Sequence, residues 1–386
     1  MTNTLTGLTK TIYLALDKVS RELVGFIPNV YRNSTAEQAA LNQEITYPVA
    51  PAAAAIDITP GVNAPDNGDQ AIGNGSLKIT KSRAVPVRWN GEQQRGATNS
   101  GWYNELLMQQ FAQAFRTLGN EIEADFGALY VKSSRAYGTA GTAPFGTPSD
   151  LSDIAGIRQI LEDNGCPTSE LRLILGTAAA ANIRGKQAQL FKANEAGTDN
   201  MLRRGTIGEL EGFLVGVSAQ VKKHVKGTGA NYVTSGATAV GVSDIALITG
   251  TGTVKAGDLV VFADDTVNKY INGTAIAAPG TISLNKPGAL VSIGTANALT
   301  VGNGYTANLA FDRMALHLIT RVPASPVGPD GKPMDSADDV MLVTDPVTGL
   351  TFQISMYKQY KQIVYMVELA WGVGSVKDAH LATLLG

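Results

Sequence analysis

The chain has 386 residues, with 31 Lys and Arg against 33 Asp and Glu, a net charge of −2 and one cysteine. Charged residues make up 17% of the sequence, compared with about 25% in an average soluble domain, and hydrophobic residues make up 44%. This composition excludes a disordered chain, a disulfide framework and a strongly basic nucleic-acid-binding surface. The length predicts two or three domains, whose weakly charged surface we expect a partner to cover in part.

Neither a signal peptide nor a membrane span is indicated. Residues 1–10 do not combine a basic region with an apolar run, and no stretch approaches the ~18 uncharged apolar residues that a span needs. We therefore expect a protein that stays in the cytoplasm and has no membrane partner. The single Cys166 excludes a multi-thiolate metal site and is expected to be a reduced, inert thiol.

The first hundred residues contain one helical pattern and a long irregular stretch. Residues 8–32 carry apolar side chains at every third or fourth position, which predicts an amphipathic N-terminal helix ending near Pro28. Residues 34–99 are interrupted by prolines and glycines, and only 44–49 and 77–89 are typical of strands. We therefore predict a long two-stranded excursion that packs outside its own domain.

The strongest helical pattern covers 102–134, with Asn99 or Ser100 as the predicted N-cap. At 1.5 Å per residue this helix would be about 50 Å long, which is longer than a small domain is wide. It would therefore span a large domain or form the backbone of an elongated subunit. Its buried face is predicted to be one apolar stripe, formed by Leu107, Phe111, Ala114, Phe115, Leu118, Ile122, Phe126 and Leu129.

Residues 135–222 alternate between helical and strand patterns, which predicts a mixed α/β unit. Ser149 and Asp150 are predicted to cap its first helix. The predicted elements are a helix at 151–164, a buried strand at 171–175, a helix at 177–183 and a strand at 212–217.

Residues 223–304 lose the helical period and are predicted to form a small all-β barrel or sandwich. Turns such as Asn272-Gly273 separate its strands. The predicted strands are 246–249, 258–262, 281–284 and 289–293. Strand-like alternation returns at 314–320 and 352–371, which indicates that the β module is inserted into the α/β unit and not appended to it.

The three histidines form no recognisable site. His224, His317 and His380 share no helical turn or metal-ligand spacing, and no carboxylate recurs beside them at such a spacing. We predict that they are structural or solvated. Cys166 lies at a predicted helix end without a base that could activate it.

Glycine-rich and charged segments also lack the spacing of known sites. The run 176–186 and the glycines at 372–374 fit neither a P-loop nor a dinucleotide fingerprint, so we predict turns. Other charged groups are predicted to lie in solvated loops or on a solvated face, namely Asp264, Asp265, the carboxylates of 335–339, Lys222, Lys223 and Lys226. The sequence therefore predicts no catalytic, cofactor-binding or metal-binding residue, which counts against an enzyme.

The order of these elements resembles the major capsid proteins of tailed double-stranded-DNA bacteriophages, which have the Hong Kong 97-type fold. It is similar in particular to short-tailed-phage coat proteins that carry an inserted β-barrel domain. The resemblance covers nearly the whole chain. It rests on the arm helix at 8–32, the strands at 44–49 and 77–89 that frame an extended loop, and the spine helix at 102–134.

Three shorter stretches add to the resemblance. Residues 205–213, Gly-Thr-Ile-Gly-Glu-Leu-Glu-Gly-Phe, look like the G-x-I-x-x-x-x-G-F turn and strand of the family's axial domain. Residues 255–262 are similar to a strand entry of the insertion domain, and 368–379 resemble the family's final strand.

The resemblance implies an α+β fold of seven successive parts. These are an N-terminal arm (1–34), an extended loop with the first peripheral-domain strands (35–98), the spine helix of the peripheral domain (99–137), the first part of the axial domain (138–222), an inserted β-barrel domain (223–304), the axial-domain return (305–345) and the C-terminal strands of the peripheral domain (346–386).

The resemblance also implies a function. The protein would be a structural major capsid protein without a cofactor, which assembles in the bacterial host cytoplasm and ends in the virion. Its partners would be copies of itself in pentamers and hexamers of an icosahedral shell, a scaffolding protein, a portal, an optional decoration protein and the packaged double-stranded DNA, touched without sequence specificity. The shell would form through a scaffolded procapsid that expands on packaging. A low charge fits both broad contacts and loose DNA contact.

Seven residues are expected to make assembly or core contacts, namely Trp102, Phe111, Phe115 and Phe126 on the spine stripe, Gly212 and Phe213 in the axial domain, and Trp371. Two other interpretations stay open. An encapsulin-like nanocompartment shell would use the same fold around enzyme cargo, although encapsulins lack such an insertion. A surface binding or adhesive protein would use 223–304 as its ligand module, and would need exposed aromatics there, where only Tyr232, Phe262 and Tyr270 are available.

Overall fold

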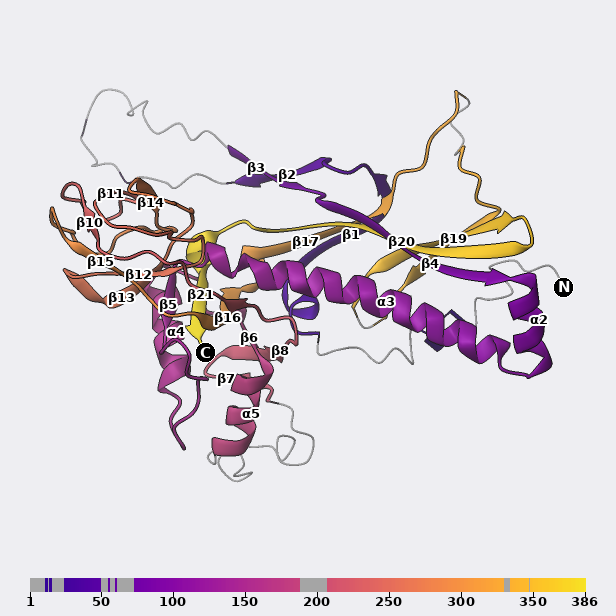
Figure 1. Cartoon of the computed structure of the whole chain (residues 1–386), viewed down its shortest axis with the longest axis horizontal. Helices are drawn as coiled ribbons and strands as arrows, with labels where there is room; N and C mark the ends of the chain where they lie inside the picture. Colours follow the sequence, from indigo (N-terminus) through magenta and orange to yellow (C-terminus); the bar gives the residue numbers. More distant parts are fainter. Residues whose placement is uncertain are drawn as a thin grey trace.

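The computed structural model describes residues 11–12, 14–15, 24–49, 55, 60, 73–187, 207–329, 334–346 and 348–386. The fold is mixed α/β, with few helices and many strands. The molecule is elongated: one long helix and a sheet run along its long axis, and a β module lies at one end (Figure 1).

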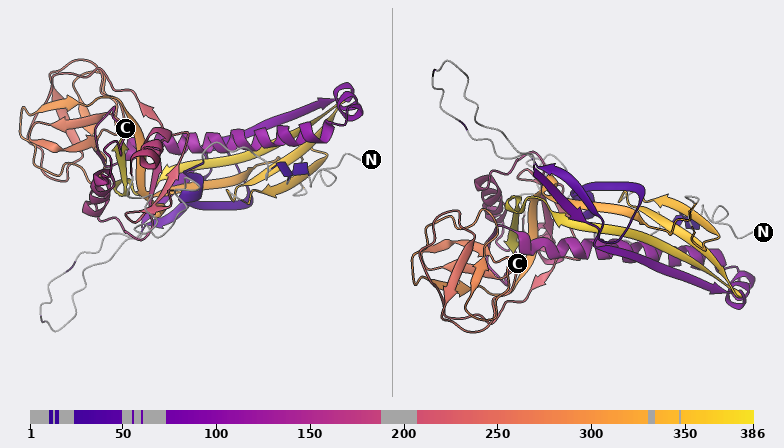
Figure 2. Two further views of the ribbon diagram at one scale, coloured as in Figure 1. Left: turned by 90° about the horizontal axis from the view of Figure 1, so that it is seen from below. Right: turned by 90° about the horizontal axis from the view of Figure 1, so that it is seen from above.

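The long axis is built from a sheet of six strands in the described part of the chain. Its order is β1 (Tyr31–Ala39), β17 (Leu316–Pro323), β20 (Gln362–Ser375), β19 (Thr351–Gln359) and β18 (Asp339–Thr344), with β4 (Lys81–Asn90) paired to β20. The helix α3 (Tyr103–Gly127) lies along β4 and β20 (Figure 2). Its apolar stripe and the sheet enclose the main hydrophobic core, which includes Phe111, Phe126 and Trp371.

A second, larger sheet joins the middle of the molecule to the β module. Its order in the described residues is β14, β11, β10, β15, β12, β13, β5, β21, β16, β6, β8 and β7, with β9 paired to β16. The bounds are β5 (Arg135–Tyr137), β6 (Leu171–Leu175), β7 (Glu209–Leu210), β8 (Phe213–Val217), β9 (Lys223–His224), β10 (Tyr232–Thr234), β11 (Asp244–Ile248), β12 (Leu259–Phe262), β13 (Asp265–Ile271), β14 (Thr281–Ser283), β15 (Ala298–Val301), β16 (Tyr305–Asp312) and β21 (Leu381–Leu385). Strands β10 to β15 enclose a hydrophobic core of their own, and the helices α4 (Ser152–Asp163) and α5 (Thr177–Lys186) flank β6 and β21 (Figure 1).

The predicted spine helix is correct in its stripe and wrong in its bounds. A separate helix α2 (Gly91–Asn99) comes first, and its N-cap Asn90 accepts from the Gln93 N–H. Ser100 is the C-cap of α2, and the N-cap position of α3 is Trp102, which makes no side-chain capping bond, so the predicted cap at Asn99 or Ser100 is wrong. The left-handed Gly101 then breaks the helix. The helix α3 ends at Gly127 and tightens into a 3₁₀ turn at Ala128–Lys132, so its 25 residues span about 37 Å and not 50 Å.

The predicted N-terminal helix lies mostly outside the described residues, and its last part is wrong. A 3₁₀ turn (Ile27–Asn29) and then the strand β1 replace it there. The strand β1 pairs in parallel with β17, which lies almost three hundred residues later in the sequence. No local sequence pattern predicts this pairing.

The predicted strand at 77–89 is two strands. Strand β3 (Gly73–Lys78) pairs with β2 (Glu44–Val49) as a hairpin that joins neither large sheet, and β4 enters the smaller sheet after a crossing at Ile79. Gly372 and Gly374 lie inside β20 and not in a turn, because the hairpin packs across β20 there. A side chain at Gly372 would collide with the Lys78 carbonyl.

The C-terminal half differs from the predicted division. The return segment 305–345 is shared, since β16 joins the larger sheet while β17 and β18 join the smaller one. The strand similar to the family's final strand, β20, ends at Ser375, and β21 follows it into the larger sheet beside β5 and β16. Residues 289–293 form no strand beyond a single bridge from Ile293 to Thr238.

Candidate functional site

The residues predicted to make contacts divide into a buried group and an exposed one. Side chains of five of them are buried, namely Phe111, Phe115, Phe126, Phe213 and Trp371. Trp102 is 61% exposed and lies just before α3, outside the core. Gly212 has a left-handed backbone in the turn between β7 and β8. The buried group therefore serves the interior of the chain, whereas Trp102 and Gly212 are accessible to a partner.

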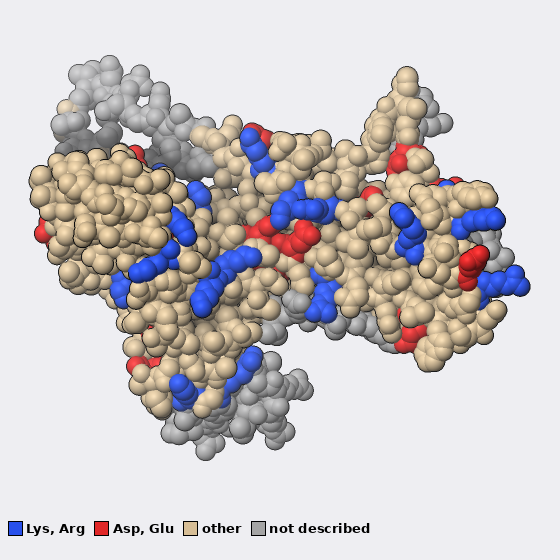
Figure 3. All heavy atoms as spheres, in the orientation of Figure 1, with Lys and Arg blue, Asp and Glu red and all other residues tan. Residues whose placement is uncertain are grey.

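Large apolar side chains are exposed over much of the described surface. Edge strand β18 presents Val340 and Leu342, and the turn between β19 and β20 presents Tyr360. Figure 3 shows that charged side chains on one face are scattered, and that the β module is mostly uncharged there. Between residues 227 and 303 the sequence holds seven charged residues, of which Asp258 and Asp265 are buried. Such a surface suits broad contacts that depend little on charge.

The hairpin β2–β3 pairs with neither large sheet, and side chains of both its strands pack on the body. The Tyr47 ring packs against the His317 ring at 5.8 Å, and His317 also contacts the Tyr31 ring at 4.7 Å. Burial lowers the pKa of His317, whose Nε2 lies 3.1 Å from the Met314 carbonyl oxygen. These contacts make His317 a structural residue that seats the hairpin.

A cavity of about 500 Å³ lies between this hairpin and the body. Its lining includes His317, His380, Asp312 and Lys377. Burial raises the pKa of Asp312 and lowers that of His380. Among the described residues, no three His, Cys, Asp or Glu side chains come close enough together to hold a metal ion. Nearby Cys166 is buried, and burial raises the pKa of its thiol to about 12, so it stays protonated at neutral pH.

The neck of the β module is built around His224. The strand that enters the module, β9, pairs with the strand that leaves it, β16. The His224 Nε2 lies 2.7 Å from Asp258 Oδ1, and the Tyr130 hydroxyl lies 2.8 Å from His224 Nδ1. Because a carboxylate accepts, Nε2 donates to it, and in the neutral imidazole Nδ1 accepts from the tyrosine. The sequence prediction missed this cluster because its members lie far apart in the chain.

Two further contacts close the neck. Asp258 also accepts the backbone N–H groups of Gly227 and Lys255, at 3.0 and 2.7 Å. The Tyr305 hydroxyl donates to the Gly257 carbonyl at 2.7 Å. Burial raises the pKa values of Tyr130 and Tyr305, so both stay neutral donors. The neck is therefore a buried polar cluster that joins the module to the segment after α3.

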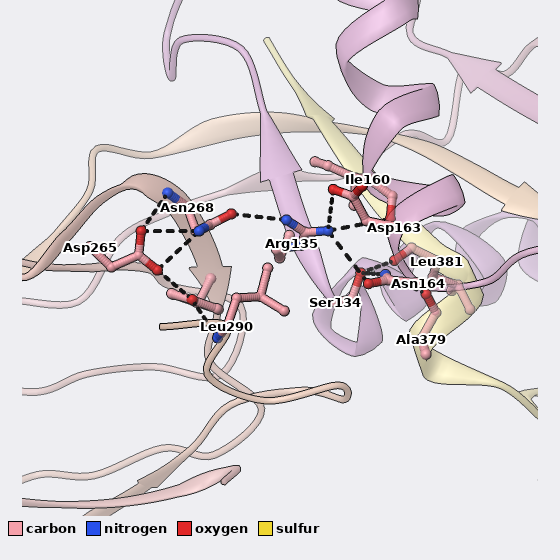
Figure 4. A network of polar contacts seen from close by, with 11 residues as sticks. Ser134, Arg135, Ile160, Asp163, Asn164, Asp265, Asn268, Leu290, Ala379 and Leu381 are labelled. Atoms are coloured by element: carbon pink, nitrogen blue, oxygen red, sulfur yellow. Dashed lines mark hydrogen bonds and ion pairs between the residues drawn. The ribbon is translucent and has the colours of Figure 1, made fainter. Parts of the chain in front are cut away.

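A second attachment of the module runs through Arg135 (Figure 4). Strand β13 of the module pairs with β5, which places Arg135 opposite Tyr270. The Arg135 guanidinium donates to Asn268 Oδ1 at 2.9 Å and, on its other side, to Asp163 Oδ2 of α4 at 3.3 Å. Asp265, predicted to lie in a solvated loop, is buried and accepts from Asn268 and Tyr270.

Arg135→Lys is expected to lower the free energy of unfolding by about 2 kcal/mol, because one ammonium group cannot serve both sides of the network. Chemical denaturation of the full chain measures the loss. The matched control is Arg158→Lys on α4, a more exposed arginine that pairs with Glu162 at 2.7 Å and donates to the Glu211 carbonyl at 2.9 Å, where we expect a loss of about 1 kcal/mol or less. Equal losses in the two variants would remove Arg135 as an attachment point.

Comparisons with known proteins add a likeness in shape. No protein-family model matches the sequence, and no curated protein matches it either. The chain is similar to the capsid of cyanophage P-SCSP1u, with a TM-score of 0.48 and 10% identity over 95% of this chain and 88% of that one. It is also similar to the capsid of a native GTA particle (TM-score 0.47, 10% identity, 95% and 91% covered) and to a virus-like particle from Pyrococcus furiosus (TM-score 0.42, 8% identity, 100% of both chains).

Since these three TM-scores lie below 0.5, we draw no function from the likeness. Among the helices of the described residues, none has both the length and the apolar character needed to cross a membrane.

Proposed function

We propose that this protein is a structural subunit that assembles with copies of itself into a closed shell around double-stranded DNA. The observation that carries the proposal is the shape of the subunit. An elongated body has a hairpin, β2–β3, that pairs with neither large sheet, together with exposed apolar side chains on an edge strand. A two-stranded hairpin that belongs to neither large sheet gains packing area when it lies on another subunit.

The weak charge of the surface supports the same proposal. A shell subunit meets several non-equivalent neighbours, so contacts that do not depend on one pattern of charges suit it. A net charge of −2 also fits loose contact with packaged DNA, because tight phosphate binding would need a basic surplus.

We base the proposals on lattice, assembly partners and maturation on the sequence resemblance. The subunits would form pentamers and hexamers of an icosahedral lattice, assembled in a bacterial host with a scaffolding protein and a portal. The procapsid would expand as DNA enters, and the β module, with predicted bounds 223–304, would be an inserted domain that contacts neighbouring capsomers.

A ligand-binding function for the β module has less support. Sugar-stacking surfaces need exposed aromatic rings. The three aromatics available, Tyr232, Phe262 and Tyr270, are all fully buried in the core of the module.

The test is electron microscopy of the protein after sedimentation, expressed alone and together with its neighbouring genes. Closed shells tens of nanometres across are expected, filled with DNA in the complete system. Shells that hold a cargo enzyme and no DNA would favour a nanocompartment. Uniform monomers or dimers under both conditions would refute shell assembly, and a glycan screen would then be the next step.

Deleting residues 50–74, which lie between β2 and β3 and include the first two residues of β3, is expected to leave a folded, soluble subunit that forms no closed shells. The reason is that the deletion removes the segment between β2 and β3 from contact with other subunits, while both large sheets keep all their strands. The control replaces 50–72 with a Gly/Ser linker of equal length, which separates the effect of the sequence from that of the length. Normal shells from the deletion variant would contradict the role given to the hairpin.

A further inference from the structure

The segment Gly25–Asn29 passes between α3 and the end of β8. The Phe26 ring stacks between the rings of Phe126 and Phe311, with centroids 6.0 and 6.4 Å away. A side chain at Gly25 would come within 2.9 Å of the Val217 backbone, so the segment lies directly against β8. We call Gly25–Asn29 the strap.

One carboxylate holds the strap. Glu123 on α3 is 0% exposed, and its Oε1 accepts the Ile27 N–H at 2.7 Å. Its Oε2 accepts the N–H groups of Gly25 and Phe26, both at 3.1 Å, and the Ser218 hydroxyl at 2.7 Å. Three consecutive backbone donors therefore converge on one side chain, almost a hundred residues away in the sequence.

This carboxylate has no cationic partner among the described residues. The charged neighbours on α3 are directed elsewhere, since Asp125 pairs with Lys81 at 2.7 Å and Glu121 lies 3.7 Å from Arg83. A buried carboxylate without a counter-ion is stable only while its donors stay in place. Loss of the strap would therefore expose Glu123 to water, and loss of the carboxylate would leave three backbone donors unpaired.

We propose that the strap opens and closes as one unit, and that Glu123 is the positioning residue that holds it closed. The strap packs through the buried side chains of Phe26 and Ile27, whereas β17 and β20 are connected by their own hydrogen bonds. Opening therefore costs the three backbone bonds to Glu123 and the burial of these two side chains, and does not require the sheets to separate. This inference concerns the folded subunit and does not depend on shell assembly.

The strap should also respond to pH with a defined sign. Burial raises the pKa of Glu123, and its four donors offset only part of that effect. When the strap opens, the carboxyl group is hydrated and titrates at its ordinary pKa. The closed strap therefore binds a proton more tightly than the open one. It is favoured most at pH values below the ordinary pKa, and this advantage is lost as the pH rises through the raised pKa.

Hydrogen exchange of the full chain, followed at the amides of Gly25, Phe26 and Ile27, tests the proposal. In Glu123→Gln these amides should exchange at least about tenfold faster than in the wild type, because the glutamine N–H₂ group faces other donors. The matched control Glu105→Gln lies on the exposed face of α3 and should change nothing there. If Glu123→Gln does not fold, Ser218→Ala removes one of the four bonds and should produce a smaller increase at the same three amides.

Two results would overturn the proposal. Exchange at the three amides that matches the control would show that Glu123 does not hold the strap. Exchange of these amides only together with the amides of α3 would show that the strap does not open by itself. The predicted pH dependence is tested by an NMR titration that follows the carboxyl carbon of Glu123. A midpoint at or below the ordinary range for glutamate would contradict the prediction that burial raises the pKa of Glu123.

Discussion

Phe126→Ala is expected to lower the free energy of unfolding by about 3–5 kcal/mol, the usual cost of removing a large aromatic side chain from a well-packed core. Phe126 is fully buried on α3 and stacks on Phe26 at 6.0 Å. The cavity would open where the helix, the strap and the larger sheet meet, so the surrounding elements cannot close it by moving one side chain. Urea denaturation of the full chain, followed by circular dichroism, measures the loss.

Trp102→Ala is the control for this prediction, because it removes an aromatic side chain that the same apolar pattern places next to the stripe. Since Trp102 is 61% exposed, we expect a change within about 0.5 kcal/mol. A loss at Trp102 as large as at Phe126, or no loss at Phe126, would show that the packing of α3 differs from the one described.

The parts of the fold that the sequence could predict are those with a local period. The stripe of α3 repeats every three or four residues, and each of its members from Leu107 to Phe126 is buried. The short apolar run of β6 predicts a buried strand with its bounds, Leu171–Leu175. Trp102 lies outside the buried stripe because it occupies the N-cap position of α3, directly after the left-handed Gly101 and before the first turn of the helix.

The parts that it could not predict depend on pairing between distant segments. Parallel pairs such as β1 with β17 and β5 with β21 need a partner that no local window contains. The same holds for polar clusters. Asp265 looks like a loop carboxylate in the sequence. Its partner Asn268 is close to it in the chain, but the strand β5 beside it, whose Arg135 donates to Asn268, is 133 residues away from Asn268.

Asp258→Asn is expected to lower the free energy of unfolding by about 3 kcal/mol, because it breaks the neck cluster at its most buried member. Asp258 is 0% exposed and accepts from His224, Gly227 and Lys255. Asparagine keeps one acceptor oxygen and turns an N–H₂ group toward donors that then lack a partner. Thermal unfolding of the full chain, with hydrogen exchange to locate the change, measures the effect.

The location of the change decides what the neck does. If His224 and Asp258 join the module to the body, then amides of β9, β12 and β16 should lose protection in Asp258→Asn, while those of α3 near Phe111 keep theirs. The matched control is Asp264→Asn, an exposed carboxylate that accepts the Gly294 N–H at 2.8 Å, where we expect a loss of about 1 kcal/mol or less. Protection lost evenly over the whole chain would instead mean that the neck is part of one cooperative core, because its opening would then need the unfolding of both sheets.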